Sequence, residues 1–259
     1  MILFKKISII SCFLIFFLYG GLIASLFYFF QWDPLTTTLT SQRTIFSIRL
    51  SLIAATVSTV LSVLIALPSA FALSRYDFPG KRAVDTILEL PMIVSPAALG
   101  AMLLIFFNNP LGLWIQDHGA QFVFTFYGIV LAQFVTVCGV STRLIKAAMD
   151  EIPVRYEAVA RTLGASPAKA FFTITLPLSR RGIYAACILS WAKALGEFGA
   201  TITIAGSMSM KTETLPIAIF MRLASAEIEG TVVLILILVS IGLSILYVVR
   251  LLSRRDSYA

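Results

Sequence analysis

The feature that most constrains this chain is a series of long segments without a charged side chain. Five segments contain no Asp, Glu, Lys or Arg: residues 7–32, 50–74, 90–116, 121–142 and 230–249. A sixth, 182–210, is interrupted only by Lys193 and Glu197. The hydrocarbon core of a bilayer is crossed by roughly 20 helical residues. Each segment is long enough, so the sequence predicts six membrane-spanning helices.

The composition agrees with a membrane protein built from helices. Of the 259 residues, 59% are hydrophobic and 13% are charged, and the mean hydropathy is +0.94, far from the values of soluble domains. A transmembrane β-barrel would alternate polar and apolar residues over strands of about ten positions, and these segments do not alternate. The predicted fold class is therefore all-α. The first segment is longer than the core of a signal peptide, which has about 7–15 residues, and is interpreted as a retained helix.

The basic residues predict the orientation of the helices. Cytoplasmic segments of membrane proteins carry an excess of Lys and Arg. If the amino terminus is cytoplasmic, 15 of the 20 Lys and Arg residues fall in inner segments, four fall outside and Lys193 lies in the membrane. Both termini are then predicted to be cytoplasmic. A basic face against anionic lipid accounts for the net charge of +7 without a nucleic-acid partner.

The longest inner segment, 143–181, has the pattern of a helix–turn–helix. Gly164 suits the left-handed position that ends a helix. Ser166 and Pro167 are typical of an N-cap and first residue of a second helix, which Pro177 is expected to end. Helices this short need a surface to pack on, in part the inner ends of the spans and in part a partner protein. Their apolar residues are Leu163, Phe171, Phe172, Ile174 and Leu176.

This segment resembles the cytoplasmic signature loop of ATP-binding-cassette (ABC) importer permeases. That loop reads Glu-Ala-Ala, three residues, Gly, nine residues, Ile, one residue and Leu-Pro. Here Gly164, Ile174 and Leu176-Pro177 stand at that spacing, whereas the acidic residue, Glu157, stands one place early. The resemblance implies the type I ABC importer permease fold, whose coupling helices dock on a separate ATPase. It assigns ATPase coupling to Glu157, Ala160, Arg161, Gly164, Ala165, Ser166 and Pro167.

The predicted spans divide the chain into three parts. Residues 1–44 hold the first helix and an outer loop, 45–252 form the transmembrane domain, and 253–259 form a short cytoplasmic tail. The remaining spans are placed near 50–74, 87–107, 121–142, 182–205 and 230–250, with the coupling loop at 143–181. No internal repeat is visible, so one copy is expected to line half of a pathway and to form a two-fold homodimer.

The sequence contains no motif for binding ATP. No Gly-x4-Gly-Lys-Ser/Thr loop is present, since Gly80-Lys81 is followed by Arg82. The chain is therefore expected to be no enzyme and to bind no cofactor. ATP and Mg²⁺ are expected on two copies of a partner ATPase, and an extracytoplasmic oxyanion-binding protein is expected to deliver the substrate.

Cysteine and histidine give no sign of a metal site. Cys12, Cys138 and Cys187 are far apart in predicted spans, and His118 is the single histidine. This spacing fits neither a disulfide framework nor a set of metal ligands. The cysteines are interpreted as small apolar packing residues.

The stretch from 191 to 206 carries the two charges that lie deep in the membrane. Lys193 stands eleven residues past Gly182, which places it about 16 Å along a helix and near the midplane. Intramembrane charges are costly and usually face an interior or water. On one continuous helix the small and polar positions Ser190, Lys193, Glu197, Ala200, Thr201 and Ile204 form a stripe. The translocation pathway is assigned to Ser190, Lys193, Glu197 and Thr201 and to Ser95 of the third span. The alternative is that Lys193 and Glu197 neutralise each other, or pair with neighbouring helices, only to hold the bundle together.

Prolines mark the third span. Pro91 and Pro96 remove helix hydrogen bonds near Ser95, so a kink is expected there. The freed backbone either faces a cavity or belongs to an ordinary tolerated kink. Glu89 is expected to pair with basic residues of the inner loops. On the outer side, residues 214–229 are expected to form an amphipathic surface helix, either a docking face or a solvated connector.

Residues 193–202, Lys-Ala-Leu-Gly-Glu-Phe-Gly-Ala-Thr-Ile, are similar to the fifth span of molybdate/tungstate permeases. Sulfate permeases have a related version, and the stretch 198–201 favours the molybdate/tungstate branch. The resemblance implies a permease subunit of an ATP-driven oxyanion importer, a multi-pass protein of the cell membrane. Sulfate or another solute stays open as the substrate. An ion-gradient-driven transporter with Glu197 as proton carrier, or a channel or scaffold subunit, is the alternative from another class.

Overall fold

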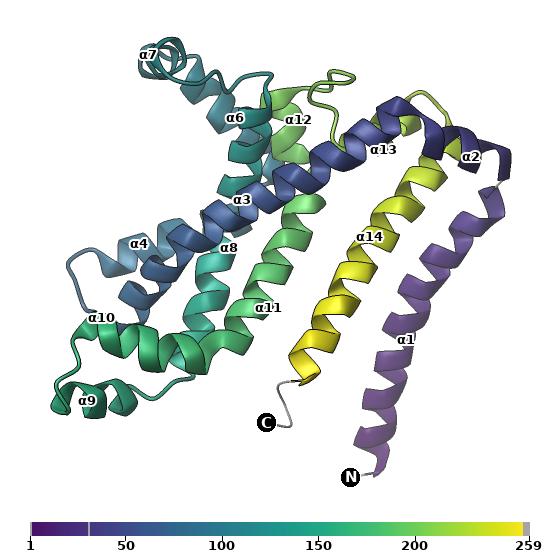
Figure 1. Cartoon of the computed structure of the whole chain (residues 1–259). Helices are drawn as coiled ribbons and strands as arrows, with labels where there is room; N and C mark the ends of the chain where they lie inside the picture. The colour runs from purple at the N-terminus through teal and green to yellow at the C-terminus, as the bar shows by residue number, and fades with distance from the viewer. Residues whose placement is uncertain (1, 31, 256–259) are drawn as a thin grey trace.

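The computed structural model describes residues 2–30 and 32–255, and every regular element in these ranges is a helix (Figure 1). The amino-terminal elements are α1 (Ile2–Leu26), η1 (Phe27–Phe29), α2 (Trp32–Thr40) and α3 (Gln42–Arg75). The next are α4 (Lys81–Leu88), α5 (Leu90–Ile93), α6 (Pro96–Phe107), α7 (Pro110–His118) and α8 (Phe126–Asp150). The rest are α9 (Arg155–Thr162), α10 (Pro167–Ala170), η2 (Phe171–Thr175), α11 (Leu176–Leu195), α12 (Gly199–Ala205), α13 (Leu215–Ala224) and α14 (Ile228–Arg255). Residues 256–259 of the predicted tail lie outside the described residues.

Four helices in the described ranges are long and apolar enough to cross a membrane. They lie at Phe4–Phe29, Gln42–Arg75, Phe126–Asp150 and Ile228–Tyr247. The pair Lys81–Ile93 and Pro96–Phe107 adds a fifth if the two count as one bent span, and the bend between them is 112°. The kink predicted near Ser95 is therefore confirmed. The count of long apolar helices falls short of the six predicted spans because the stretch 182–205 is not one helix.

The break in that stretch has a packing cause. α11 ends at Leu195 and α12 begins at Gly199, so the helix predicted over 182–205 is interrupted at 196–198. Gly199 lies against α6, where a Cβ atom would stand 2.9 Å from the backbone nitrogen of Ala97. The close approach of two backbones, which only glycine permits, turns the chain here. The single continuous stripe predicted from Ser190 to Ile204 was wrong for this reason.

Pro177 does not end a helix as predicted. The chain is helical without interruption from Pro167 to Leu195, through α10, η2 and α11 (Figure 1). η2 is a π-helical turn, and Pro177 falls within the first turn of α11. A proline there is tolerated because the wider turn already departs from the α-helical hydrogen-bond pattern that proline would break.

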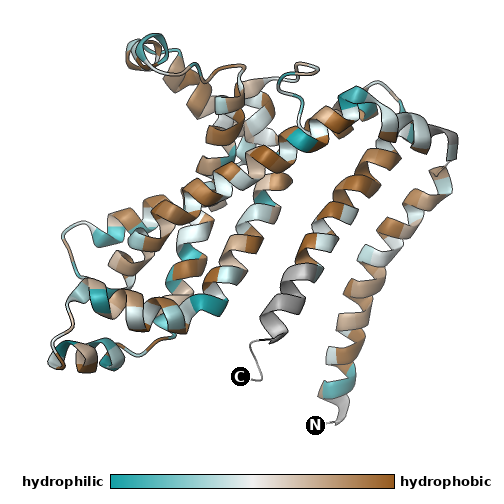
Figure 2. Cartoon of the chain, viewed as in Figure 1, coloured by the Kyte–Doolittle hydropathy of each residue, from teal (hydrophilic) through white to brown (hydrophobic). Residues whose placement is uncertain are grey.

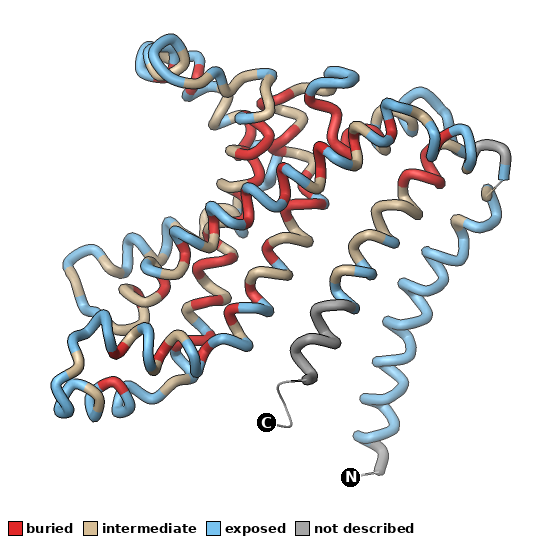
Figure 3. Tube along the Cα trace, in the orientation of Figure 1, coloured by how far each residue is buried: buried red, intermediate tan, exposed pale blue. Residues whose placement is uncertain are grey.

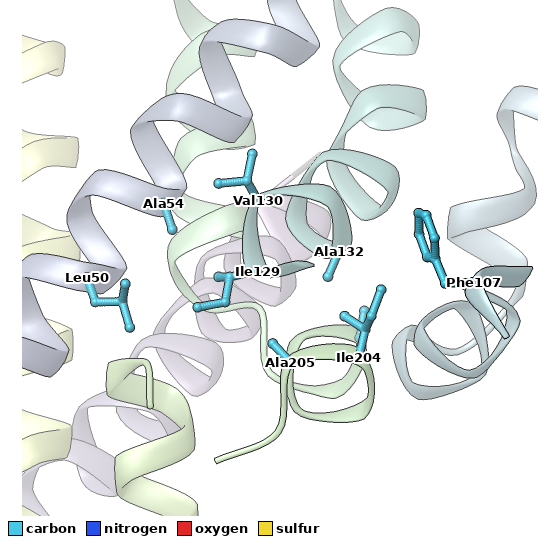
Figure 4. Close-up of a cluster of buried hydrophobic side chains, with 9 residues drawn as sticks. Leu50, Ala54, Phe107, Ile129, Val130, Ala132, Ile204 and Ala205 are labelled. Carbon is cyan, nitrogen blue, oxygen red and sulfur yellow. The ribbon is translucent and has the colours of Figure 1, made fainter. Parts of the chain in front are cut away.

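The core lies where α3, α8, α11 and α12 meet. α3 packs along α8 and α11, and α12 packs on α6 and α8. Figure 3 shows the buried residues gathered along these helices. One cluster joins side chains of four helices, and in Figure 4 its labelled members are Leu50, Ala54, Phe107, Ile129, Val130, Ala132, Ile204 and Ala205.

α1 stands apart from this core. From Phe4 to Ser25 its residues are exposed, and no part of its apolar stretch is buried against the rest of the chain (Figure 3). Its side chains are largely apolar, whereas hydrophilic residues gather near the helix ends and in the connections (Figure 2). An apolar helix of this kind suits a hydrocarbon environment.

The outer connection before α14 differs from its prediction. The amphipathic helix expected over 214–229 ends at Ala224, and Glu229 already belongs to α14. Its first residues, Leu215–Ala218, are buried against α3 and α14. α13 is thus partly an interior element and not a helix that lies freely on the surface.

Candidate functional site

The first candidate site is the coupling elbow, which we define as residues 155–170. α9 ends at Thr162, and Gly164 adopts a left-handed backbone with φ of +89°. The N–H of Ala165 donates to the carbonyl of Ala160 at 3.0 Å, which closes the end of α9. The hydroxyl of Ser166 accepts from the N–H of Lys169 at 3.2 Å, and Pro167 opens α10. The predicted turn and cap of the helix–turn–helix are confirmed.

The inner face of the elbow is fixed to the bundle by Glu157. Its carboxylate accepts from Nε of Arg75 at 2.7 Å and from the hydroxyl of Thr175 at 2.5 Å. The side chains of Arg75 and Glu157 are only 5% and 12% exposed. Arg75 also donates to the carbonyls of Met149 and Ile152. Glu157 therefore joins α9 to the ends of α3 and α8 and to η2.

The outer face of the elbow is apolar and uncovered. Val159 is 59% exposed and Leu163 is 84% exposed, with Tyr156 one turn before them. These positions follow a spacing of three and four residues, so they share one side of α9. Phe172 is also exposed, whereas Phe171 packs on Phe71 with ring centroids 4.7 Å apart. Of the apolar residues predicted to need a packing surface, Leu163 and Phe172 stay largely exposed in the described part of the chain.

The remaining predicted coupling residues lie on the elbow surface. Arg161, Gly164, Ser166 and Pro167 are exposed, and Ala160 and Ala165 are half-buried. Glu157 is the exception, because it faces inward. A partner protein that covers α9 would contact the exposed residues of this set. It would not contact Glu157, which would affect the partner only by fixing the position of α9.

The second candidate site is a pocket at the bend between α5 and α6. Its volume is about 460 Å³, and it is lined by Pro91, Met92, Ile93, Val94, Ser95, Pro96, Val140 and Lys193. Ser95 caps α6 by accepting from the N–H of Ala98 at 3.3 Å. α8 comes close to the start of α5 because Gly139 has no side chain: a Cβ there would stand 2.2 Å from the carbonyl oxygen of Leu88 and 3.5 Å from Cδ of Pro91. The structure thus brings two predicted pathway residues, Ser95 and Lys193, to one cavity.

Lys193 brings a positive charge to this pocket. Within residues 2–30 and 32–255 it forms no ion pair or hydrogen bond with another side chain, so the suggested pairing with Glu197 is absent. The positive end of the α6 helix dipole lies at the same cavity. A lysine and a helix N-terminus create a local environment that favours an anion.

The other predicted pathway residues lie in the packed interior. Glu197 accepts from the N–H of Ala200 at 3.0 Å and so stabilises the start of α12. The hydroxyls of Ser190 and Ser141 are 2.7 Å apart and share a hydrogen bond. Thr201 is fully buried, and its hydroxyl has no partner in the described part of the chain. None of the three lines the pocket.

The walls of the pocket are held by close contact of α6 with α12. A Cβ on Gly100 would stand 2.7 Å from the carbonyl oxygen of Ala200.

The prediction that Glu89 pairs with a basic residue is confirmed, since it contacts Arg143, whose guanidinium also lies 3.7 Å from Asp85. Among the described residues, no group of three or more His, Cys, Asp and Glu side chains is arranged to hold a metal ion.

Sequence reasoning missed the partners of the elbow and of the outer connection. Arg75 was counted only as an inner positive charge, yet it is the residue that holds Glu157. On the other side of the molecule, Arg43 donates two hydrogen bonds to Glu213, at 2.7 and 2.5 Å. The available signal was the position of Arg43 and Arg75 near the two ends of one long, mostly apolar helix. The sequence does not reveal which carboxylates these arginines meet.

Comparison with protein families gives one match over most of the chain. Residues 62–257 match the model described as "Binding-protein-dependent transport system inner membrane component". The molybdenum transport system permease protein ModB of Haemophilus influenzae is 37% identical over 177 residues, 67% of this chain and 77% of the relative. The protein of that name from Escherichia coli K12 is 40% identical over 62% of this chain and 73% of the relative. The sulfate transport system permease protein CysT of Escherichia coli K12 is 28% identical over 87% and 82%.

Solved structures share the fold. A chain of a bacterial ABC transporter that imports the acidic polysaccharide alginate superposes with a TM-score of 0.80 at 19% identity, covering 97% of this chain and 96% of that one. A chain of the alginate transporter bound to a periplasmic protein also gives 0.80, at 17% identity and with 99% and 96% coverage. The MetNI methionine ABC transporter gives 0.65 at 17% identity, with 83% and 99% coverage. The helices therefore adopt the fold of ABC importer permeases.

Proposed function

The chain belongs to the family of binding-protein-dependent transport system inner-membrane components, and from this membership we propose that it forms the translocation pathway of an ATP-driven molybdate importer. As a member of this family it is a multi-pass protein of the cell membrane and a transport subunit, not an ATPase. The single observation that carries the substrate is the likeness to the molybdenum permeases, at 37% and 40% identity. Tungstate, with similar tetrahedral chemistry, is the second substrate of the proposal.

The proposed topology has six spans with both termini in the cytoplasm. The spans are α1, α3, the bent pair α4–α6, α8, the broken pair α11–α12, and α14. The amino-terminal end of α1 and the carboxy-terminal end of α14 lie at the same end of the molecule as α9 in Figure 1. The excess of basic residues in these segments supports the cytoplasmic assignment of that end.

The proposed partner of the coupling elbow is an ABC ATPase, present in two copies with ATP and Mg²⁺ bound to it. The elbow has a buried polar inner face and an uncovered apolar outer face of Tyr156, Val159 and Leu163. A helix that exposes an apolar stripe while its other side is fixed is suited to insertion into a groove of another protein. Motion of the ATPases would then move the elbow as a unit.

The proposed path passes the pocket at the α5–α6 bend. Lys193 supplies a positive charge that has no partner among the described residues, and Ser95 lies at the N-terminus of α6. A charge on one side of a pathway attracts an oxyanion without enclosing it, so the ion can leave again. A second copy of the chain completes the path, and an extracytoplasmic oxyanion-binding protein supplies the ion. The alginate transporter solved with its periplasmic protein supports a binding-protein partner.

The proposal is tested by transport in proteoliposomes. The chain is reconstituted with its ATPase and its binding protein, and uptake of radiolabelled molybdate, tungstate and sulfate is measured with and without ATP. We expect ATP-dependent uptake of molybdate, competed by tungstate and not by sulfate. Uptake of sulfate in preference to molybdate would contradict the substrate, and uptake by the chain alone under an ion gradient would contradict the ATP-driven class.

The contact with the ATPase is tested by crosslinking in the same assembly. Leu163→Cys places a thiol on the exposed stripe, and Trp114→Cys places one on the exposed surface of α7, at the other end of the molecule from α9 in Figure 1. We expect a crosslink to the ATPase from position 163 and none from position 114. If the Leu163→Cys complex transports normally and position 163 forms no crosslink to the ATPase, the proposed contact is contradicted.

A further inference from the structure

One helix is tied to each part of the molecule that the proposed mechanism uses. α3 is 34 residues long, and it runs in Figure 1 from the α2 and α13 end to the α9 and α10 end. Arginines lie close to its two ends, at positions 43 and 75. At 1.5 Å per residue these positions are about 48 Å apart, which exceeds the thickness of the hydrocarbon core. Each arginine holds a buried glutamate from a segment distant in sequence.

The inner tie is the contact of Arg75 with Glu157 on the coupling elbow. The two residues are 82 positions apart, and both side chains are almost fully buried. A charged pair removed from water keeps its geometry, because each partner alone would be left desolvated. Movement of α9 is therefore passed to the end of α3.

The outer tie is the contact of Arg43 with Glu213. Nε and Nη2 of Arg43 donate to the two carboxylate oxygens at 2.7 and 2.5 Å. The Glu213 side chain is fully buried, whereas that of Arg43 is 47% exposed. About two turns further along α3, the hydroxyl of Ser51 accepts from the N–H of Leu215, the first residue of α13, at 2.7 Å. A two-oxygen fork fixes orientation as well as distance.

The segment held by this outer tie connects α12, which packs on α6, to α13. It runs over residues 206–214, and Met208 and Met210 are exposed on it. Between the two ties, the indole N–H of Trp191 donates to the hydroxyl of Thr56 on α3 at 3.1 Å. Trp191 stands two residues before Lys193 on α11. α3 thus contacts the elbow, the neighbourhood of the pocket lysine, and the outer connection.

We propose that α3 is the rod that transmits movement of the elbow across the membrane, and that Arg43–Glu213 is the latch by which it positions the outer connection 206–214. Arg43 and Glu213 are positioning residues and do not touch the transported ion. The proposal rests on the proposed function, because it needs an ATPase that moves the elbow. It goes beyond that function by naming the residues through which the two sides of the membrane are coupled.

The test uses the complete transporter in proteoliposomes and compares two arginines of the same helix. Arg43→Met removes the latch, and Arg49→Met is the matched control because Arg49 is exposed on α3 and forms no ion pair in the described part of the chain. Basal ATP hydrolysis, its stimulation by the loaded binding protein, and molybdate uptake are measured. For Arg43→Met we expect basal hydrolysis to persist while stimulation and uptake fall about fivefold or more, the range of a typical coupling energy. Arg49→Met is expected to match the unaltered protein.

A second measurement covers the case in which Arg43→Met does not assemble. Arg43→Lys keeps the charge but replaces the fork with a single point contact. A spin label at Lys211→Cys, in a chain whose cysteines are replaced, reports the mobility of the outer connection before and after nucleotide trapping. We expect trapping to change the spectrum with Arg43 and to change it less with Arg43→Lys.

The outcomes separate the two proposals. If the unaltered complex shows no ATP-dependent uptake, the proposed function fails. If that complex transports normally while Arg43→Met or Arg43→Lys shows full stimulation, uptake and spectral change, the latch is wrong and the function stands. Loss of basal and stimulated hydrolysis in equal proportion would also overturn the latch, because it would indicate a general structural role.

Discussion

The coupling elbow and the pocket at the α5–α6 bend distribute their polar and apolar groups in opposite ways. In the elbow the charged Glu157 is buried and paired, and apolar side chains such as Leu163 are exposed. In the pocket the walls are packed, and the charged Lys193 has no partner in the described residues. The first arrangement is suited to a rigid piece that binds another protein. The second leaves the positive charge of Lys193 available to an anion in the pocket.

The largest expected effect tests the elbow half of this comparison. Arg75→Met would leave the Glu157 carboxylate buried without its cation, and removing one partner of a buried pair costs about 3–5 kcal/mol. We expect a matching loss in the free energy of unfolding, measured by thermal denaturation of the purified chain in detergent. Lys81→Met is the control, because its pair with Asp77 is on the surface and is expected to contribute nothing measurable. Equal stability of the two variants would mean that the elbow is not held by its buried pair.

The next effect tests the packed wall of the pocket. Gly100→Ala would place a Cβ 2.7 Å from the carbonyl oxygen of Ala200 and 2.8 Å from its Cα. Overpacking of this kind costs about 1–3 kcal/mol, so the melting temperature and transport should fall together. Gly21→Ala in α1 meets no atom within 4 Å and should be neutral or slightly stabilising. A stable Gly100→Ala variant would show that α6 and α12 can separate at no cost.

A smaller effect is expected at the turn of the elbow. Gly164 has a φ of +89° and no atom near an added Cβ, so Gly164→Ala introduces backbone strain without a clash. The left-handed conformation costs other residues about 1–2 kcal/mol. Gly242→Ala, at a helical glycine of α14 with equally open space, is the matched variant. We expect loss of ATP-dependent transport only in the first, and full transport by Gly164→Ala would remove the need for a sharp turn.

The smallest effect on stability is expected at Lys193. Because the Lys193 side chain has no partner in the part of the chain that the structure describes, Lys193→Met should change the free energy of unfolding by less than about 0.5 kcal/mol. Molybdate uptake should nevertheless fall about tenfold, equivalent to about 1.4 kcal/mol in the transport barrier. Lys146→Met, on the inner end of α8, serves as the control for loss of one positive charge. Normal uptake by Lys193→Met would contradict the pathway.

Local signals were predictable from the sequence, and contacts between distant segments were not. The end of α9 at Gly164 and the cap at Ser166 depend on the residues of one turn, and both are confirmed. The break after Leu195 depends on the approach of Gly199 to Ala97, about a hundred residues earlier, and was missed. The stripe that assumed one helix therefore brought together residues that the structure separates, with Lys193 at the cavity and Thr201 in the core.

The partners of charged residues show the same limit. Glu89 was expected to meet a basic residue, and it contacts Arg143, but any of several inner cations satisfied the prediction. Glu157 was assigned to the elbow by its place in the motif, whereas its inward direction follows from the position of Arg75, 82 residues away. A motif predicts which residues matter. It does not predict which side of a helix they face.

The π-helical turn at Phe171–Thr175 has a consequence for the register of α11. A π turn accommodates one residue more than an α turn, and one residue is about 100° of rotation on a helix with 3.6 residues per turn. Deleting the exposed Thr173 would let the segment relax to regular α-helix and would turn every later side chain of α11 by that angle relative to the elbow. The direction in which Lys193 points is thus set by the one extra residue of the π-helical turn that directly precedes α11.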